Sequence, residues 1–184
     1  NYEGYVKTDY AGGQTDAGIT ADFDTPGLTE GAYGLLPNHR GHVFKAFGSY
    51  QVFDNFLVGA NALVTSGRKY GCMGFNPNDP ILNSAYGALS HYCDGKVTPR
   101  GSVFSDPWTY RLDLSARYTV PSFGLLPENG LTLRADIFNV FNTRRTVETN
   151  EFGELDSGAK NNNFRAPLAY MPPRSVRLGF DLVF

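Results

Sequence analysis

The two cysteines of the chain, Cys72 and Cys93, are the residues whose spacing points most directly to a chemistry, and His91 lies beside them in the sequence. Two thiols and one imidazole make an incomplete zinc set, because structural zinc sites usually have four protein ligands. A disulfide is the better prediction, since it would close a loop of about 22 residues and contribute roughly 3 kcal/mol to stability. Such a bond also indicates an oxidising compartment.

Other residues with catalytic or ligand potential lack partners at a recognisable spacing. His39 and His42 lie where a loop meets a predicted strand, and we identify no serine and aspartate that complete a catalytic triad with them. We expect these histidines at the surface or rim. The segments NPNDP and NEFGELDSG offer oxygen atoms to calcium but do not have EF-hand spacing. We therefore predict no enzyme activity, no cofactor and no metal site.

Charged residues alternate with apolar ones along the predicted strands, which places them on one face. The packed core of a soluble barrel would not accept so many charges, whereas a hydrated lumen would. Opposite charges on neighbouring strands also allow cross-strand ion pairs. The predicted lumen-facing charges are Arg111, Asp113, Arg117, Arg134, Asp136, Arg177 and Asp181.

The elements that position these charges are β-strands, because apolar and aromatic residues recur at period two between segments rich in Gly, Pro, Asn and Asp. The pattern predicts about six strands, with a bulge near Phe138–Asn142 in the fifth. Their predicted ranges are 1–9, 41–53, 56–67, 108–120, 131–148 and 172–184. Connections of about 11–40, 66–106 and 150–171 are long, whereas those at 54–55 and 121–130 are short.

Alternating long and short connections are typical of outer-membrane barrels, which have extracellular loops on one rim and periplasmic turns on the other. Trp108, Tyr110 and Tyr118 lie near the ends of the apolar face, as in an aromatic girdle at each membrane interface. Twelve strand residues tilted by about 45° span roughly 28 Å, close to the thickness of the hydrocarbon layer. The sequence therefore predicts an all-β, antiparallel transmembrane barrel segment.

Composition is compatible with this prediction. The net charge is -2 and no basic stripe is present, which argues against a nucleic-acid partner. No apolar run approaches the roughly 20 residues of a transmembrane helix. The mean hydropathy of -0.29 does not oppose a barrel, because each strand needs only one apolar face.

Two alternatives remain open at this stage: a soluble β-sandwich or lipocalin-like binding module, and an outer-membrane enzyme barrel. The connection lengths count against the first, and the missing catalytic residues count against the second. About six strands cannot close a transmembrane barrel, which needs at least about eight. Either several copies of the chain combine into one barrel, or the chain, which begins at Asn1 and not at Met, is part of a larger barrel, and we favour the second.

Three stretches resemble one family of outer-membrane proteins. The segments LRADIFNVFN and PPRSVRLGFDLVF resemble the last two strands of TonB-dependent receptors. The segment QTDAGITADFDTPGLTEGAYGLLPNHRGHVFKAFGSYQV resembles the Oar-like subgroup of these receptors. The resemblance implies a barrel of about 22 strands around an N-terminal plug, of which residues 1–184 supply the C-terminal strands. It also implies import or binding of an extracellular substrate that the sequence does not name.

The resemblance further implies an outer-membrane location, with the long loops outside and the C-terminus in the periplasm. Expected partners are the rest of the barrel and its plug, the TonB complex, outer-membrane lipid and the barrel assembly machinery. Phe184 is expected in the periplasmic aromatic girdle and in the signal that the assembly machinery reads. The lumen-facing arginines could contact the plug or an anionic substrate, but we favour a structural ladder of ion pairs.

Overall fold

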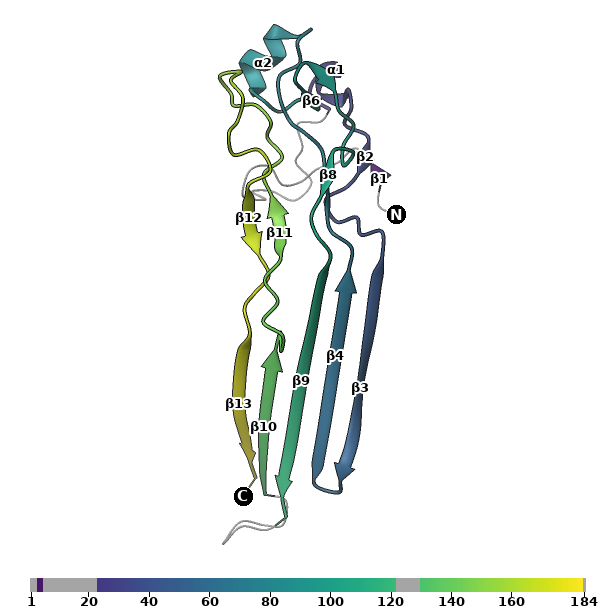
Figure 1. Ribbon diagram of the computed structural model, residues 1–184, viewed down its shortest axis with the longest axis vertical. Helices are drawn as coiled ribbons and strands as arrows, with labels where there is room; N and C mark the ends of the chain where they lie inside the picture. Colours follow the sequence, from purple (N-terminus) through teal and green to yellow (C-terminus); the bar gives the residue numbers. More distant parts are fainter. Residues whose placement is uncertain (1–2, 5–22, 122–129, 184) are drawn as a thin grey trace. The chain divides into compact units, whose positions relative to one another are not determined.

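The computed structural model describes residues 3–4, 23–121 and 130–183 (Figure 1). The chain divides into two compact units. The sheet unit contains His42–Thr65, Trp108–Arg145 and Met171–Phe184, and the loop unit contains Asn1–Gly41, Ser66–Pro107 and Thr146–Tyr170. Each unit is therefore built from three separate stretches of sequence.

The sheet unit consists of five long antiparallel strands in the order β13-β10-β9-β4-β3, which Figure 1 shows side by side. Their alternating apolar and polar residues give each strand one face of each kind. The strands are β3 (Val43–Phe53), β4 (Phe56–Thr65), β9 (Thr109–Val120), β10 (Leu131–Phe138) and β13 (Ser175–Leu182). Within the described residues the sheet is open, since β3 and β13 each have one neighbour.

The register places all the long connections at one end of this sheet. Val43 at the start of β3 pairs with Thr65 at the end of β4, and Thr65 pairs with Thr109 at the start of β9. Phe138 at the end of β10 pairs with Ser175 at the start of β13. The short connections, at 54–55 and 121–130, join the opposite strand ends. The predicted alternation of connection lengths is thus present in the sheet.

The loop unit holds short elements, which period-two reasoning did not anticipate. Each of its helices begins with a proline. Proline costs no hydrogen bond at this position, because the N–H groups of the first turn have no acceptor within the helix. They are α1 (Pro26–Thr29) and α2 (Pro80–Tyr86). The short strands pair as β1 (Glu3–Gly4) with β2 (Gly34–Leu35), β5 (Lys69–Tyr70) with β8 (Phe104–Ser105), β6 (Tyr92–Cys93) with β7 (Lys96–Val97), and β11 (Thr146–Thr149) with β12 (Pro167–Tyr170).

One strand prediction needs correction, and another lies mostly outside the described residues. The predicted strand over 131–148 is two strands, because β10 ends at Phe138 and β11 pairs in a different sheet. Of the predicted strand over 1–9, only Glu3 and Gly4 lie in the described part, and they pair with Gly34–Leu35 in the loop unit. Within the described residues the main sheet accordingly has five strands.

The buried apolar core of the described residues lies entirely in the loop unit. It comprises Leu28, Ala32, Tyr70, Cys72, Met73, Leu82, Ala88 and Tyr92. Large apolar side chains of the sheet unit are exposed instead. Among the described helices, none has the length and apolar character to cross a membrane.

Candidate functional site

The charged face of the sheet brings together the side chains that the sequence singles out. Residues directly opposite each other on paired strands share a face. Asp136 is opposite Ser115 on one side and Arg177 on the other, and Arg134 is opposite Arg117 and Gly179. All seven predicted charges lie on this one face, which Lys45, Ser49, Gln51, Asn61, Thr119 and Thr132 continue. Phe47, Leu57 and Leu63 interrupt its polarity.

Two ion pairs cross from β10 to β13. Arg177 donates from Nε to Asp136 Oδ2 at 2.9 Å, and its Nη2 lies 2.8 Å from the same oxygen. Arg134 pairs diagonally with Asp181, which is opposite Thr132. These two contacts form the ladder of cross-strand ion pairs that the sequence pattern allows. That this face lines a lumen stays a prediction.

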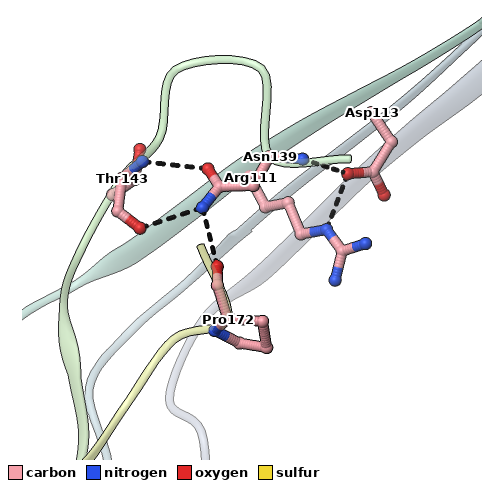
Figure 2. A network of polar contacts seen from close by, with 5 residues as sticks. All are labelled: Arg111, Asp113, Asn139, Thr143 and Pro172. Atoms are coloured by element: carbon pink, nitrogen blue, oxygen red, sulfur yellow. Dashed lines mark hydrogen bonds and ion pairs between the residues drawn. The ribbon is translucent and has the colours of Figure 1, made fainter. Parts of the chain in front are cut away.

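A third ion pair lies within β9 and extends into a network (Figure 2). Arg111 Nε donates to Asp113 Oδ1 at 2.7 Å, because residues two apart on a strand share a face. The same oxygen accepts the backbone N–H of Asn139 at 2.8 Å. The Asp113 side chain is only 15% exposed, so this carboxylate is among the most sheltered of the face.

Asn139 fastens the chain where it leaves β10. Its side-chain amide donates to the carbonyls of Thr143 at 3.0 Å and Pro172 at 2.9 Å, and its Oδ1 accepts the N–H of Thr143 at 2.9 Å. Its φ of 52° lies in the left-handed region, which asparagine adopts more readily than most residues. The Val140 N–H donates to the Leu112 carbonyl at 2.8 Å.

That last bond identifies a bulge at Asn139. The register Ile137↔Leu114, continued without interruption, would place Asn139 opposite Leu112, but Val140 bonds there instead. Directly after β10 the chain therefore has one extra residue relative to β9. This agrees with the bulge predicted from the blurred pattern near Phe138–Asn142. Sequence reasoning did not find the role of Asn139 itself, although two asparagines in FNVFN were a signal for left-handed backbone.

Phe138 lies between two arginines of the charged face. The Arg177 guanidinium carbon is 5.3 Å from the centre of its ring, and the Arg111 guanidinium carbon is 5.8 Å from it. Both distances fall within the range of cation–π attraction. Arg111 and Arg177 are thus each held by a carboxylate and by an aromatic ring.

Arg117 differs from the other three arginines. Among the described residues no carboxylate pairs with it, and its direct neighbour across β10 is another cation, Arg134. It lines a pocket of about 370 Å³ on the charged face, together with Arg134, Asp136 and Arg177. Small residues, including Ser49, Gly59, Ser115 and Gly179, leave the space open.

The opposite face of the sheet is apolar across all five strands. One row of direct neighbours runs from Tyr50 through Val58, Ala116 and Ala135 to Leu178. A second row runs from Phe56 through Tyr118 and Leu133 to Phe180. Trp108 comes directly before β9, Tyr110 lies at the start of β9, and Tyr118 lies near its end. The Trp108 ring stacks on His42, with the ring centres 5.7 Å apart. Their girdle role stays a prediction, and Phe184 lies outside the described residues.

In the loop unit, Cys72 and Cys93 form a disulfide, with Cα atoms 5.5 Å apart. His39 and His91 are buried, 5% and 2% exposed, so the surface position expected for His39 is wrong. His91 Nε2 lies 3.2 Å from Arg100 Nη2, and Arg100 Nε donates to the Ala32 carbonyl at 2.7 Å. These histidines belong to the packing of the loop unit.

A buried triangle of hydrogen bonds joins three distant segments of the loop unit. The Tyr70 hydroxyl donates to Asp106 Oδ2 at 2.8 Å, Thr149 Oγ1 donates to Asp106 Oδ1 at 2.6 Å, and the Thr149 N–H donates to the Tyr70 hydroxyl at 3.0 Å. Burial raises the pKa of Tyr70, the nearby Arg68 opposes this, and the bond to Asp106 raises it further. Sequence reasoning found none of these three residues, because no local pattern links them.

Two guanidinium groups are close to this triangle. Arg68 lies over the Tyr70 ring, with its guanidinium carbon 4.8 Å from the ring centre. Burial lowers the pKa of Arg40, and the charge of Arg68 lowers it further, while Tyr70 and Asp106 act in the opposite direction. Because its hydrogen bonds join three segments that are distant in sequence, we interpret the cluster as a structural clamp.

Comparison with known proteins gives one informative similarity. The chain is 27% identical over 224 aligned positions to the TonB-dependent transporter Oar of Myxococcus xanthus. The alignment covers 100% of this chain but 20% of that transporter, so the chain spans about a fifth of its length. No model of a known protein family matches the chain, and no solved structure matches it significantly. The similarity supports a distant relationship between this chain and a TonB-dependent transporter.

Proposed function

We propose that this chain forms part of the barrel wall of a TonB-dependent transporter in a Gram-negative outer membrane. The apolar face contacts lipid, the charged face lines the barrel interior, and the chain has a structural role without catalysis. The distant similarity to Oar supports the transporter class. The observation that carries the proposal is the apolar face, which is continuous over five strands and exposed.

The apolar face has the properties of a surface in hydrocarbon. Its exposed side chains include Leu178 at 76%, Tyr50 at 71% and Phe180 at 70%. Monomeric soluble proteins rarely expose such large contiguous apolar patches. A soluble sandwich would bury this face against a second sheet, whereas a membrane barrel leaves it in contact with lipid. The exposure therefore favours the barrel wall over the soluble binding module.

The open edges of the sheet support a larger assembly. Unpaired strand edges are not tolerated in lipid, because their N–H and C=O groups would have no hydrogen-bond partner. We infer that further strands pair with β3 and β13, and we expect a barrel of about 22 strands that surrounds a plug. TonB, which supplies energy to such transporters, and the barrel assembly machinery are the further partners in this proposal.

The loop unit is proposed to lie outside the cell and to form part of the substrate entrance. All three of its stretches connect to the same end of the sheet, where Val43, Thr65, Thr109, Phe138 and Ser175 lie. Outer-membrane barrels have their long loops on the extracellular rim. A disulfide in this unit is compatible with an oxidising environment.

Two neighbouring residues of β9 allow a matched test of the two faces. Ser115 is opposite Asp136 and lies on the charged face, whereas Ala116 is opposite Ala135 and lies on the apolar face. Each is replaced by cysteine in the complete protein, labelled with a nitroxide and reconstituted into liposomes. Collision rates are then measured with oxygen, which concentrates in hydrocarbon, and with a neutral nickel chelate, which stays in water.

We expect the Ala116→Cys label to have the higher ratio of oxygen to nickel collisions, and the Ser115→Cys label the lower ratio. A label at Ala116→Cys that collides with neither reagent indicates a buried face, as in a soluble sandwich. Equal exposure of both labels to the nickel chelate also contradicts the membrane assignment. Cys72 and Cys93 do not take the label, because they are joined in the disulfide.

A further inference from the structure

The charges on the interior-facing side of the sheet are not balanced. Arg111 has Asp113, Arg134 has Asp181 and Arg177 has Asp136. Arg117 has no carboxylate among the described residues. The cations of this face, Lys45, Arg111, Arg117, Arg134 and Arg177, outnumber its carboxylates, Asp113, Asp136 and Asp181.

The strand register places the unbalanced positive charge at Arg117. Arg117 and Arg134 are direct cross-strand neighbours, and like charges in that relation are destabilising. Asp181 neutralises Arg134 from the side of β13, which is the side away from Arg117. On its other side Arg117 is opposite Leu57, which offers no charge. A negative group beside Arg117 would relieve the repulsion.

The space for such a group exists. The pocket of about 370 Å³ is open beside Arg117, and an added methyl group at Gly179 would meet no atom within 4 Å. The hydroxyls of Ser49 and Ser115 also line the pocket and can donate to an oxygen. A guanidinium with neighbouring hydroxyl donors matches a carboxylate, which accepts two parallel hydrogen bonds from arginine.

We propose that Arg117 binds the carboxylate of an aspartate or glutamate from a polypeptide segment outside the five strands, a segment that lies against the charged face. The proposal rests on the proposed function, because it needs this face to point into the barrel. A carboxylate that belongs to the same polypeptide is present at a high effective concentration. A dissolved anion has to compete with salt and water at the dilute concentration of the medium, so it is the weaker candidate for a permanent counter-ion.

A zero-length cross-link can identify the partner directly. In the complete protein Arg117 is replaced by lysine, which keeps the positive charge and supplies an amine. A water-soluble carbodiimide then activates a carboxylate in contact with that amine. The amine displaces the carbodiimide as its urea and forms an amide, so the linked pair is lighter by one water. Mass spectrometry of the digested protein identifies the peptide attached at position 117.

The matched control is Arg177→Lys, because Arg177 already contacts Asp136. We expect the control to link position 177 to Asp136, and Arg117→Lys to link position 117 to an acidic residue outside the five strands. If the control links and Arg117→Lys gives no polypeptide cross-link, or links only to Asp136 or Asp181, the proposal is wrong. A dissolved anion as the partner would give that same negative result.

The two proposals can fail separately. If the nitroxides at Ser115→Cys and Ala116→Cys report water and lipid as expected, a negative cross-link removes only the role of Arg117. If they do not, the barrel-wall assignment itself is wrong. Heat-modifiable migration on a gel confirms that each lysine variant is assembled before the cross-linking result is interpreted.

Discussion

Asp113 Oδ1 accepts the backbone N–H of Asn139 at 2.8 Å, across 26 residues of sequence. This bond joins the middle of the charged face to the bulge at the end of β10. Because the same oxygen also accepts Arg111 Nε, one sheltered carboxylate positions both a charged side chain and a backbone turn. The bond connects the polar pattern of β9 to the path of the chain toward β11.

The first prediction concerns Asn139, whose side chain satisfies three backbone groups of Thr143 and Pro172. Replacing Asn139 by alanine leaves these buried groups without partners and puts a methyl side chain in the left-handed region. We expect a loss of about 2–4 kcal/mol in the free energy of unfolding, from unsatisfied polar groups and backbone strain together. Urea unfolding of the complete protein in detergent, followed by circular dichroism, measures this loss.

Asn139→Gly separates the two causes, because glycine accepts a φ of 52° without strain. We expect this variant to lose about 1–3 kcal/mol, from the hydrogen bonds alone. If both variants unfold like the native protein, Asn139 does not fasten the chain at the end of β10.

The sheet could be predicted from the sequence because the alternation that defines each strand is visible in a short stretch of residues. Period-two alternation assigns each residue to a face regardless of which strand lies beside it, so the charges from Arg111 to Asp181 were placed correctly on one face. The limits of β3, β4 and β9 also followed from the alternation and from the turn at Asp54–Asn55. The break between β10 and β11 was predicted only as a bulge, because Asn139 redirects the chain through contacts with Thr143 and Pro172.

The loop unit could not be predicted in the same way, because its contacts are distant in sequence. Tyr70 bonds to Asp106 across 36 residues, and the Thr149 N–H bonds to Tyr70 across 79. No period marks such pairs. The disulfide was the exception, because two cysteines allow only one intramolecular pairing.

A second prediction concerns Gly67, where the backbone approaches Asp106 closely. A methyl group added at Gly67 would lie 1.7 Å from the Asp106 carbonyl oxygen, so the backbone has to shift. We expect Gly67→Ala to destabilise the loop unit by roughly 1–3 kcal/mol, the usual cost of overpacking. Hydrogen exchange of residues 66–107, measured by mass spectrometry, reports this locally. Gly48→Ala is the control, since nothing lies within 4 Å there, and an equal effect in both variants would contradict the steric explanation.

A third prediction concerns the disulfide, which links residues 21 positions apart. Replacing Cys72 and Cys93 together by alanine frees that loop in the unfolded state. We expect the loop unit to lose about 3 kcal/mol of stability. Limited proteolysis should then cut the doubly substituted protein between positions 72 and 93 faster than the native protein. A reductant should speed the cleavage of the native protein and leave that of the doubly substituted protein unchanged. Native and doubly substituted proteins with equal cleavage rates would show that the bond does not stabilise the loop unit.

The last prediction follows from the raised pKa of Tyr70, which is caused first by burial and then strengthened by the bond to Asp106. The folded state holds the phenol proton more tightly than the unfolded state, whose tyrosine pKa is near 10.0. The stabilisation is therefore fully present below pH about 10 and is lost as the pH rises above that value. We expect the loop unit to unfold more easily as the pH increases from about 10 toward 12.

Tyr70→Phe tests this linkage, because it removes the titrating group. At neutral pH the variant should be less stable by about 1–3 kcal/mol, since Asp106 and the Thr149 N–H each lose a partner. Its stability should then fall less steeply with alkaline pH than that of the native protein. Guanidinium unfolding at a series of pH values measures both slopes, with Tyr50→Phe, an exposed tyrosine of β3, as the control for loss of a hydroxyl. Parallel slopes for native protein and Tyr70→Phe would mean that alkaline unfolding of the loop unit starts elsewhere, because only a group that titrates differently in the two states can make stability depend on pH.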